Sequence, residues 1–129
     1  MSPTFLTLDE VLALHEDQIT RYGGRRGMRD LGLLISALGT PPATFEGIFL
    51  HNDLFEMAAA HLYHVARNHP FVDGNKRTAL ATALVFLWLN GFSLHADEDT
   101  LTDMVVRVAT DEVTKAEAAV FLKAHSKPR

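Results

Sequence analysis

The residues of this chain best suited to chemistry lie together in one short segment, His-Pro-Phe-Val-Asp-Gly-Asn-Lys-Arg, at positions 69–77. His69 carries an imidazole, the side chain that most often acts as a general base. Asp73 offers a hard carboxylate, which suits Mg²⁺ because this ion takes one or two carboxylates together with phosphate oxygens and water. The segment therefore combines a base with a metal ligand.

The same segment has the features of an anion site. It leads into a predicted helix, whose free N–H groups and partial positive charge attract anions, and Gly74 lets the backbone approach a bound group closely. Lys76 and Arg77 place two cations in the first helical turn, where they oppose the helix dipole, and an anion such as phosphate would relieve that conflict. Short polar loops before helices are also common without function. The residues alone therefore leave an equal alternative, in which Asp73 is an N-cap and the charges are solvated.

Helices must position this segment, and the turn signals of the chain predict an all-α fold. Thr7 and Glu10 have the spacing of a capping box, and apolar residues at helical spacing extend this helix to a stop at Gly23 and Gly24. Further helices are predicted over residues 31–38 with Asp30 as N-cap, up to about residue 68 with Asn52 or Asp53 as N-cap, over about 75–91, after Asp97 or Asp99, and after Thr114.

The predicted helix over residues 75–91 follows the candidate segment directly. It is apolar on nearly every face from residue 79 to residue 89, so we expect it at the centre of the bundle, with Phe86 and Trp88 in the core. Residues 40–51 hold two prolines and a glycine and are predicted as a loop with a short extended piece around residues 45–49. The predicted fold is a single-domain helical bundle around one buried helix, to which a short β-hairpin flap can be added.

Composition narrows the classes of function. At 129 residues the chain has the length of one domain, and 47% apolar residues suffice for a hydrophobic core. The absence of cysteine excludes disulfides and thiolate zinc sites, and the formal net charge of -4 disfavours sequence-independent nucleic-acid binding. No apolar run reaches the ~18 residues of a membrane helix, and the N-terminus lacks a secretory pattern. We expect a cytoplasmic protein without direct nucleic-acid or membrane binding.

The segment at residues 69–77 resembles the Fic-family motif, which reads His-Pro-Phe, any residue, Asp or Glu, Gly-Asn, one variable position and Arg. The similarity covers roughly residues 5–122, and it implies a Fic-type helical bundle over residues 1–129. The stretches that resemble Doc, the toxin branch of that family, are Arg21-Tyr22-Gly23-Gly24, Gly27 with Arg29-Asp30, Leu33-Leu34, Leu54-Phe55-Glu56 and Asn90-Gly91.

The resemblance implies that a phosphate-containing group passes from ATP, with Mg²⁺, to a hydroxyl of another protein. The general base would then be His69, and the metal ligand would be Asp73. The residues that would bind the nucleotide phosphates are Gly74, Asn75, Lys76 and Arg77.

Lys76 is the residue that distinguishes between transfer of AMP and transfer of the γ-phosphoryl group. Family members that transfer AMP usually carry a glycine at this position, whereas the Doc branch shares the lysine and transfers the γ-phosphoryl group. The resemblance therefore predicts a phosphotransferase that modifies a Ser or Thr hydroxyl of a translation factor such as EF-Tu and stops translation. AMP transfer is the alternative, and a non-catalytic interaction module is the competing class. The intact motif argues against such a module.

The sequence also bears on how the expected activity is inhibited. Fic proteins that inhibit themselves carry a helix with Ser or Thr, three residues, and then Glu followed by Gly or Asn, and that Glu pairs with the motif Arg. This chain has no such pattern, because Pro42 stands where Glu46-Gly47 would require Ser or Thr. We therefore expect nothing in the chain to occupy Arg77 at rest. The Doc resemblance implies a small antitoxin whose disordered C-terminal segment folds into a groove on the toxin.

A second group of candidate residues precedes the motif. Arg21, Gly23, Gly24 and Arg25 form a glycine-hinged basic stretch, which we predict to be a flap over the nucleotide or the protein substrate. The alternative is a solvated turn between two helices. The stretch follows no predicted strand, which argues against a Rossmann or protein-kinase loop.

Two other sets of residues carry weaker signals. His61 and His64 stand at i, i+3 spacing, which can bind zinc, but no third ligand accompanies them and we predict no metal site there. Arg67 is close enough to His69 in sequence to help hold phosphate, with a simple surface charge as the alternative.

Overall fold

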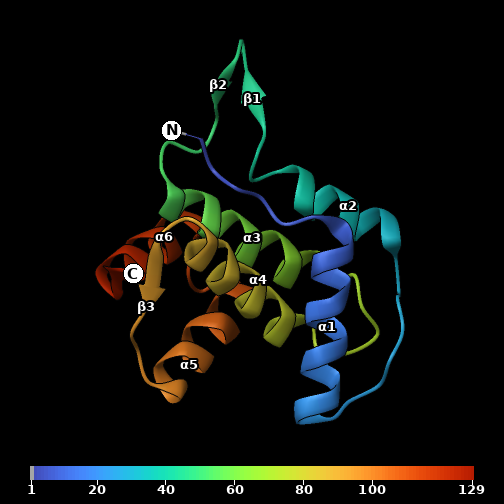
Figure 1. Ribbon diagram of the computed structural model, residues 1–129. Helices are drawn as coiled ribbons and strands as arrows, with labels where there is room; N and C mark the ends of the chain where they lie inside the picture. Colours follow the sequence, from blue (N-terminus) through green and yellow to red (C-terminus); the bar gives the residue numbers. More distant parts are fainter. Residues whose placement is uncertain (1) are drawn as a thin grey trace.

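The structure is a computed structural model that describes residues 2–129 and contains six α-helices and two small antiparallel sheets within that range (Figure 1). In chain order the elements are α1 (Leu8–Tyr22), α2 (Leu31–Gly39), β1 (Thr44–Phe45), β2 (Ile48–Phe49), α3 (Leu54–Asn68), α4 (Asn75–Leu89), β3 (Phe92–Leu94), α5 (Glu98–Ala109), α6 (Lys115–Ala124) and β4 (Ser126–Pro128). The predicted all-α fold class is confirmed, and the predicted extended piece is the β1–β2 hairpin.

Side-chain caps start most helices where the sequence predicts them. Thr7 and Glu10 form the capping box of α1, with hydrogen bonds of 2.8 and 3.2 Å. Of the two candidates at each position, Asp53 caps α3 and Asp97 caps α5. Each such cap stabilises its helix by about 1 kcal/mol. The exception is α4, whose N-cap Gly74 makes no side-chain hydrogen bond, so its first N–H groups are left without a capping side chain.

The centre of the fold is shared by α3 and α4. α3 packs against α2, α4, α5 and α6, whereas α4 packs against α1, α3, α5 and β3 (Figure 1). Phe86 of α4 is fully buried as expected, but Trp88 is 52% exposed. The prediction for Trp88 was wrong because residues two apart lie on nearly opposite sides of a helix and α4 buries only one face. The guanidinium of Arg129 lies over the exposed ring, 4.6 Å from its centroid.

The β1–β2 hairpin projects from the helical body at the top of the view in Figure 1. Its apolar side chains are mostly in solvent, with Phe45 68% and Ile48 73% exposed. The cavity at the motif, described below, is lined without any residue of this hairpin. No helix within residues 2–129 has both the length and the apolar character needed to cross a membrane.

Candidate active site

The candidate segment forms a tight loop that joins the end of α3 to the start of α4. Both ends of the loop have left-handed backbone, at His69 (φ 53, ψ 52) and at Gly74 (φ 75, ψ 19). Glycine adopts this conformation freely, but for His69 it costs about 1–2 kcal/mol. Backbone strain of this kind is retained where surrounding contacts enforce it, and it is typical of functional sites.

Asn75 holds the loop closed from within. Its carboxamide oxygen accepts the N–H of Phe71 over 2.8 Å, and its NH₂ group donates to the carbonyl oxygen of Phe71 over 3.0 Å. Asn75 is 3% exposed, and both ends of its side chain are used in these bonds. The side chain of Asn75 therefore shapes the loop, and a phosphate contact from it stays a prediction.

His15 of α1 supports the same loop from the other side. Its ring stacks on Phe71 with centroids 3.8 Å apart and planes at 4°, and its Nε2 lies 2.9 Å from the carbonyl oxygen of Asp73. Because a carbonyl only accepts, His15 must carry its proton on Nε2. His15 had no predicted role. The available signal was a histidine on the buried stripe of α1, between Val11 and Ile19.

The carboxylate of Asp73 is held by two backbone amides. Its Oδ2 accepts the N–H of Arg25 over 3.0 Å, and its Oδ1 accepts the N–H of Gly74 over 2.8 Å. These two hydrogen bonds, in that order, lower the pKa of Asp73, and the charges of Arg77 and Arg25 add to the effect. Asp73 is therefore ionised at neutral pH, and it is not the N-cap of α4, a position taken by Gly74.

Arg77 reaches from α4 to the C-terminal end of α1. Its Nη2 donates to the carbonyl oxygen of Gly23 over 2.9 Å and its Nη1 to that of Gln18 over 3.3 Å. The guanidinium also lies over the ring of Tyr22, 5.8 Å from its centroid. The C-terminus of a helix carries partial negative charge, so the Arg77 cation is stabilised there.

This contact corrects two expectations about Arg77. First, the guanidinium of Arg77 already has hydrogen-bond partners within the chain, the carbonyl oxygens of Gln18 and Gly23. Second, the unfavourable position of this cation at the start of α4 is offset by its contact with the C-terminal end of α1. The sequence could not indicate this, because the partners of Arg77 are backbone carbonyls, which carry no residue signature. Lys76 is different: it is exposed, and none of the ion pairs among residues 2–129 includes it.

A cavity of about 240 Å³ lies over the N-terminus of α4. One side is formed by the motif, and Leu80 of α4 with Thr102, Val105 and Val106 of α5 forms the other. The contribution of Thr102, Val105 and Val106 to this cavity was not predicted, since an apolar stripe predicts burial but not which side chains border a cavity. The motif residues at this cavity are His69, Asp73, Gly74, Asn75, Lys76 and Arg77.

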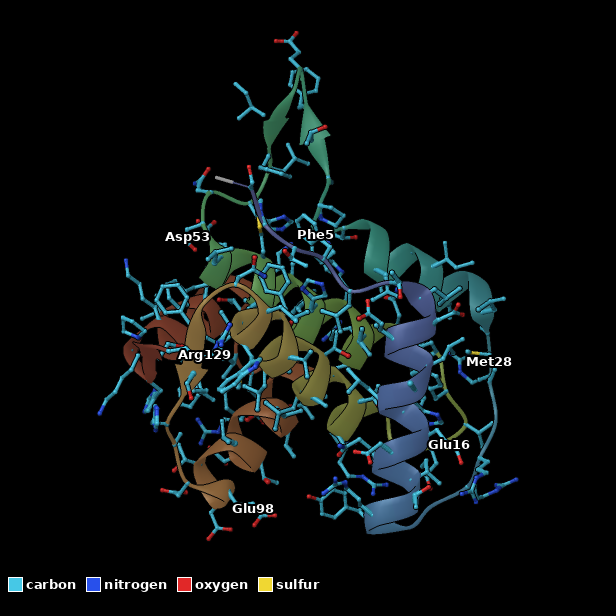
Figure 2. The ribbon with its side chains drawn as sticks, viewed as in Figure 1. Phe5, Glu16, Met28, Asp53, Glu98 and Arg129 are labelled. Atoms are coloured by element: carbon cyan, nitrogen blue, oxygen red, sulfur yellow. The ribbon has the colours of Figure 1, made fainter. Side chains whose placement is uncertain are left out.

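The glycine-rich stretch after α1 lies against the motif loop. Met28 pairs with Phe71 in an isolated antiparallel bridge, and the N–H of Val72 donates to the carbonyl oxygen of Gly27 over 3.0 Å. Figure 2 shows Met28 on this segment beside α1, where Glu16 is also labelled. Gly23, Gly24 and Gly27 all have positive φ, which supports the glycine hinge. A substrate-binding role for Arg21, Gly23, Gly24 and Arg25 stays a prediction.

The arginines of this stretch are mostly engaged within the chain. Arg21 pairs with Asp17 and Arg26 pairs with Glu16, each at 2.9 Å. Arg29 donates to the carbonyl oxygen of His69 over 2.7 Å. Two of the four arginines of the stretch are therefore neutralised by ion pairs, whereas Arg25 and Arg29 have no ion pair among residues 2–129.

The other candidate residues, His61, His64 and Arg67, make contacts that favour structural roles. His61 is 2% exposed and its Nδ1 lies 2.8 Å from the carbonyl oxygen of Met57. His64 lies beside Lys115, with 3.3 Å between Nε2 and Nζ. No group of three or more potential metal ligands occurs among residues 2–129. Arg67 pairs with Asp111 at 3.3 Å, which favours the surface-charge alternative.

The donor set of the site fits a magnesium ion held jointly with a nucleotide. Each oxygen of Asp73 accepts one N–H and keeps lone-pair capacity for a metal. Magnesium commonly uses one protein carboxylate together with phosphate oxygens and water. A single carboxylate beside an uncapped helix N-terminus and a free lysine provides such surroundings.

Together, the fold and the site define a small helical protein in which a helix start without a side-chain cap, a carboxylate and a histidine border one cavity. A model of the family described as "Fic/DOC family" matches residues 5–87. The chain belongs to this family.

Two curated proteins are similar over most of the chain. One is "Protein kinase doc" of Escherichia phage P1, 42% identical over 117 residues that cover 89% of this chain and 90% of that protein. The other is "Toxin Doc" of Mycolicibacterium smegmatis (strain ATCC 700084 / mc(2)155), 42% identical over 109 residues that cover 80% of this chain and 84% of that protein.

Proposed function

We propose that this protein is the toxin of a toxin–antitoxin pair and acts as an ATP- and Mg²⁺-dependent phosphotransferase on a Ser or Thr hydroxyl of another protein. The observation that carries the proposal is the convergence of His69, Asp73 and Lys76 on one cavity at the uncapped start of α4. The names of the two relatives, a protein kinase and a toxin, support it.

Each residue of the site has a distinct task in this proposal. His69 accepts the proton of the substrate hydroxyl, whose oxygen then forms a bond to the γ-phosphorus while the bond to the leaving ADP breaks. Asp73 is the ligand for Mg²⁺, which neutralises phosphate charge when bound. The first N–H groups of α4 and the ammonium of Lys76 hold the phosphate oxygens.

The apolar wall of the cavity suits the rest of the nucleotide. Leu80, Val105 and Val106 offer apolar surface opposite the charged residues. Nucleotide sites commonly combine an apolar surface with a few placed polar groups. This division supports a ligand with a charged end and a flat, apolar end.

We propose EF-Tu as the target, in keeping with the Doc resemblance, and an antitoxin as the second partner. A groove between α1, α4 and α5 borders the site and shares Arg77, Leu80 and Thr102 with its cavity. Its lining combines apolar residues of α4 and α5 with Tyr22 at the end of α1. A partner segment bound there as an amphipathic helix would lie next to the phosphate site.

The reaction is tested with purified protein, EF-Tu, Mg²⁺ and ATP labelled at either the α- or the γ-phosphate. We expect the label to appear on EF-Tu only from γ-labelled ATP. Label from the α-phosphate would show AMP transfer in spite of Lys76. If neither label is transferred, the same incubation with whole cell lysate and mass spectrometry distinguishes another target from a non-catalytic module.

A further inference from the structure

The turn that follows α1 contacts two charged side chains of the site, those of Asp73 and Arg77, through its backbone. The N–H of Arg25 donates to Asp73 Oδ2 over 3.0 Å. The carbonyl oxygen of Gly23 accepts from Arg77 Nη2 over 2.9 Å. Gly24, between these two residues, has a φ of 121°. The turn therefore joins the carboxylate to the guanidinium without using any side chain of its own.

Gly24 has no room for a side chain. A Cβ at this position would lie 2.8 Å from Asp73 Oδ2 and 3.2 Å from Arg77 Nη2. Gly23 is different, since its φ is also positive, at 82°, but a Cβ there would meet nothing within 4 Å. Alanine would strain the backbone at either position, but only at Gly24 would it also push against the two groups of the site.

On the basis of the proposed function, we infer that Gly24 and the backbone N–H of Arg25 are positioning elements for the metal-binding carboxylate. The N–H of Arg25 fixes Oδ2 of Asp73. Because Gly24 has no side chain, the carboxylate of Asp73 and the guanidinium of Arg77 can both lie directly against the turn. The unused lone pairs of Asp73 then have a fixed direction before any metal arrives. Hydrogen bonds behind a ligating carboxylate hold it in this way in metal sites generally.

This arrangement also assigns Arg77 a task at rest. By bonding to the end of α1, Arg77 holds the turn in place, so that the turn can hold Asp73. Lys76, whose side chain has no ion pair among residues 2–129, can meet the phosphates of the nucleotide. The side chain of Arg25 makes no hydrogen bond to Asp73, because that contact is made by the main chain, and only its charge acts on the carboxylate.

The inference is tested by Mn²⁺ binding to the full chain in the presence of a non-hydrolysable ATP analogue, followed by the EPR signal of the free ion. Gly24→Ala should weaken Mn²⁺ binding by ~10–100-fold, the usual effect of losing support behind a metal ligand. Gly47→Ala, at a hairpin glycine that also has positive φ and open space for a Cβ but lies outside the cavity, should bind Mn²⁺ as the wild type does. In the transfer reaction, Gly24→Ala should raise the Mg²⁺ concentration for half-maximal rate far more than it lowers kcat at saturating Mg²⁺.

A second pair of variants isolates the hydrogen bond and serves if Gly24→Ala does not fold. Arg25→Pro removes the N–H that Asp73 accepts, whereas Arg25→Ala keeps it. We expect weakened Mn²⁺ binding in Arg25→Pro alone. Equal Mn²⁺ affinity within either pair of variants would overturn the inference. Failure of the wild type to bind Mn²⁺ with the nucleotide analogue would instead overturn the proposed function, and the inference with it.

Discussion

At the scale of single residues, His69 is the group on which the proposed chemistry depends. It occupies a strained left-handed position at the end of α3 and borders the cavity. His69→Ala should keep the fold and slow phosphoryl transfer by ~10²–10⁴-fold, the usual contribution of a general base. The measurement is the initial rate of γ-label transfer, with circular dichroism as the control for folding. A variant that transfers label at the wild-type rate would remove His69 from the mechanism.

Lys76 differs from Arg77 because its ammonium makes no side-chain hydrogen bond or ion pair among residues 2–129, whereas the Arg77 guanidinium donates to two backbone carbonyls. Lys76→Ala should raise the KM for ATP by roughly 10-fold or more, since a charge-assisted hydrogen bond contributes about 1.5–3 kcal/mol. Its melting temperature should stay close to that of the wild type, because the side chain is exposed. Lys123→Ala, at the far end of the sequence, is the matched control for loss of one positive charge. An unchanged KM would assign the phosphates to other groups.

Residue types predicted the site better than they predicted its internal contacts. The motif residues could be chosen from their chemistry and spacing, and six of them border one cavity. The support from His15, the carbonyl partners of Arg77 and the amide of Arg25 could not be predicted. Each of these three includes a hydrogen bond to or from a backbone atom, whose position depends on the fold and not on the residue type.

At the scale of elements, α1 is the helix that supports the motif loop. His15→Phe keeps an aromatic ring on Phe71 but removes the donor to the carbonyl oxygen of Asp73. We expect a loss of about 1 kcal/mol in the free energy of unfolding, because a partly buried carbonyl group loses its hydrogen-bond donor. Urea denaturation measures this loss, and His125→Phe is a control in a histidine remote from the site in sequence. Equal stability of His15→Phe and the wild type would show that the hydrogen bond contributes nothing.

The helix starts were predictable because capping is local. Thr7, Asp30 and Thr114 act as N-caps where the sequence placed them. The position of Trp88 was not predictable from the apolar character of α4, since a helix that is apolar all round can still have one face in solvent. Which face is covered depends on packing against α1 and α3, and that is a property of the whole fold.

At the scale of the whole molecule, three histidines outside the site make the fold sensitive to acid. Burial lowers the pKa of His61 to about 4 and that of His64 to about 4. For His51, burial first and then the charge of Lys115 lower the pKa. The native state therefore favours neutral histidines, whereas the unfolded chain protonates near pH 6.5. Their contribution to stability is complete above about pH 6.5 and is lost as the pH falls toward 4.

Urea denaturation between pH 7.5 and pH 4.5 checks this pH dependence. We expect the midpoint to fall steadily below about pH 6.5. His61→Phe should flatten the dependence of the midpoint on pH, because it removes one of the buried titrating histidines. The new ring can still pack against Phe5 and Phe86. His95→Phe, at a histidine with no role in this group, should leave the slope unchanged. An identical slope in His61→Phe and the wild type would contradict the assignment.

Toxicity is the prediction that involves the complete protein and its partner. Expression of the chain alone in a bacterial host should arrest growth, and His69→Ala should relieve the arrest. Co-expression of the small open reading frame beside its gene should also relieve it, with a stable complex on co-purification. Growth at the normal rate during high expression of the wild type, in its own host cured of any such neighbour, would contradict the toxin proposal. That residues 1–129 form a single domain stays a prediction.

The backbone contacts between the end of α1 and the motif have a genetic consequence. If the toxin is expressed without its antitoxin, the surviving colonies should carry missense changes in two separate windows of the gene. One window covers codons 69–77, and the other lies upstream around codons 15–25, where the encoded segment meets Asp73 and Arg77. Chains started at the internal methionine codon 28 would keep the whole motif and lack α1, so we expect them to be harmless. An intact motif in a genome is therefore insufficient to identify an active toxin gene of this kind.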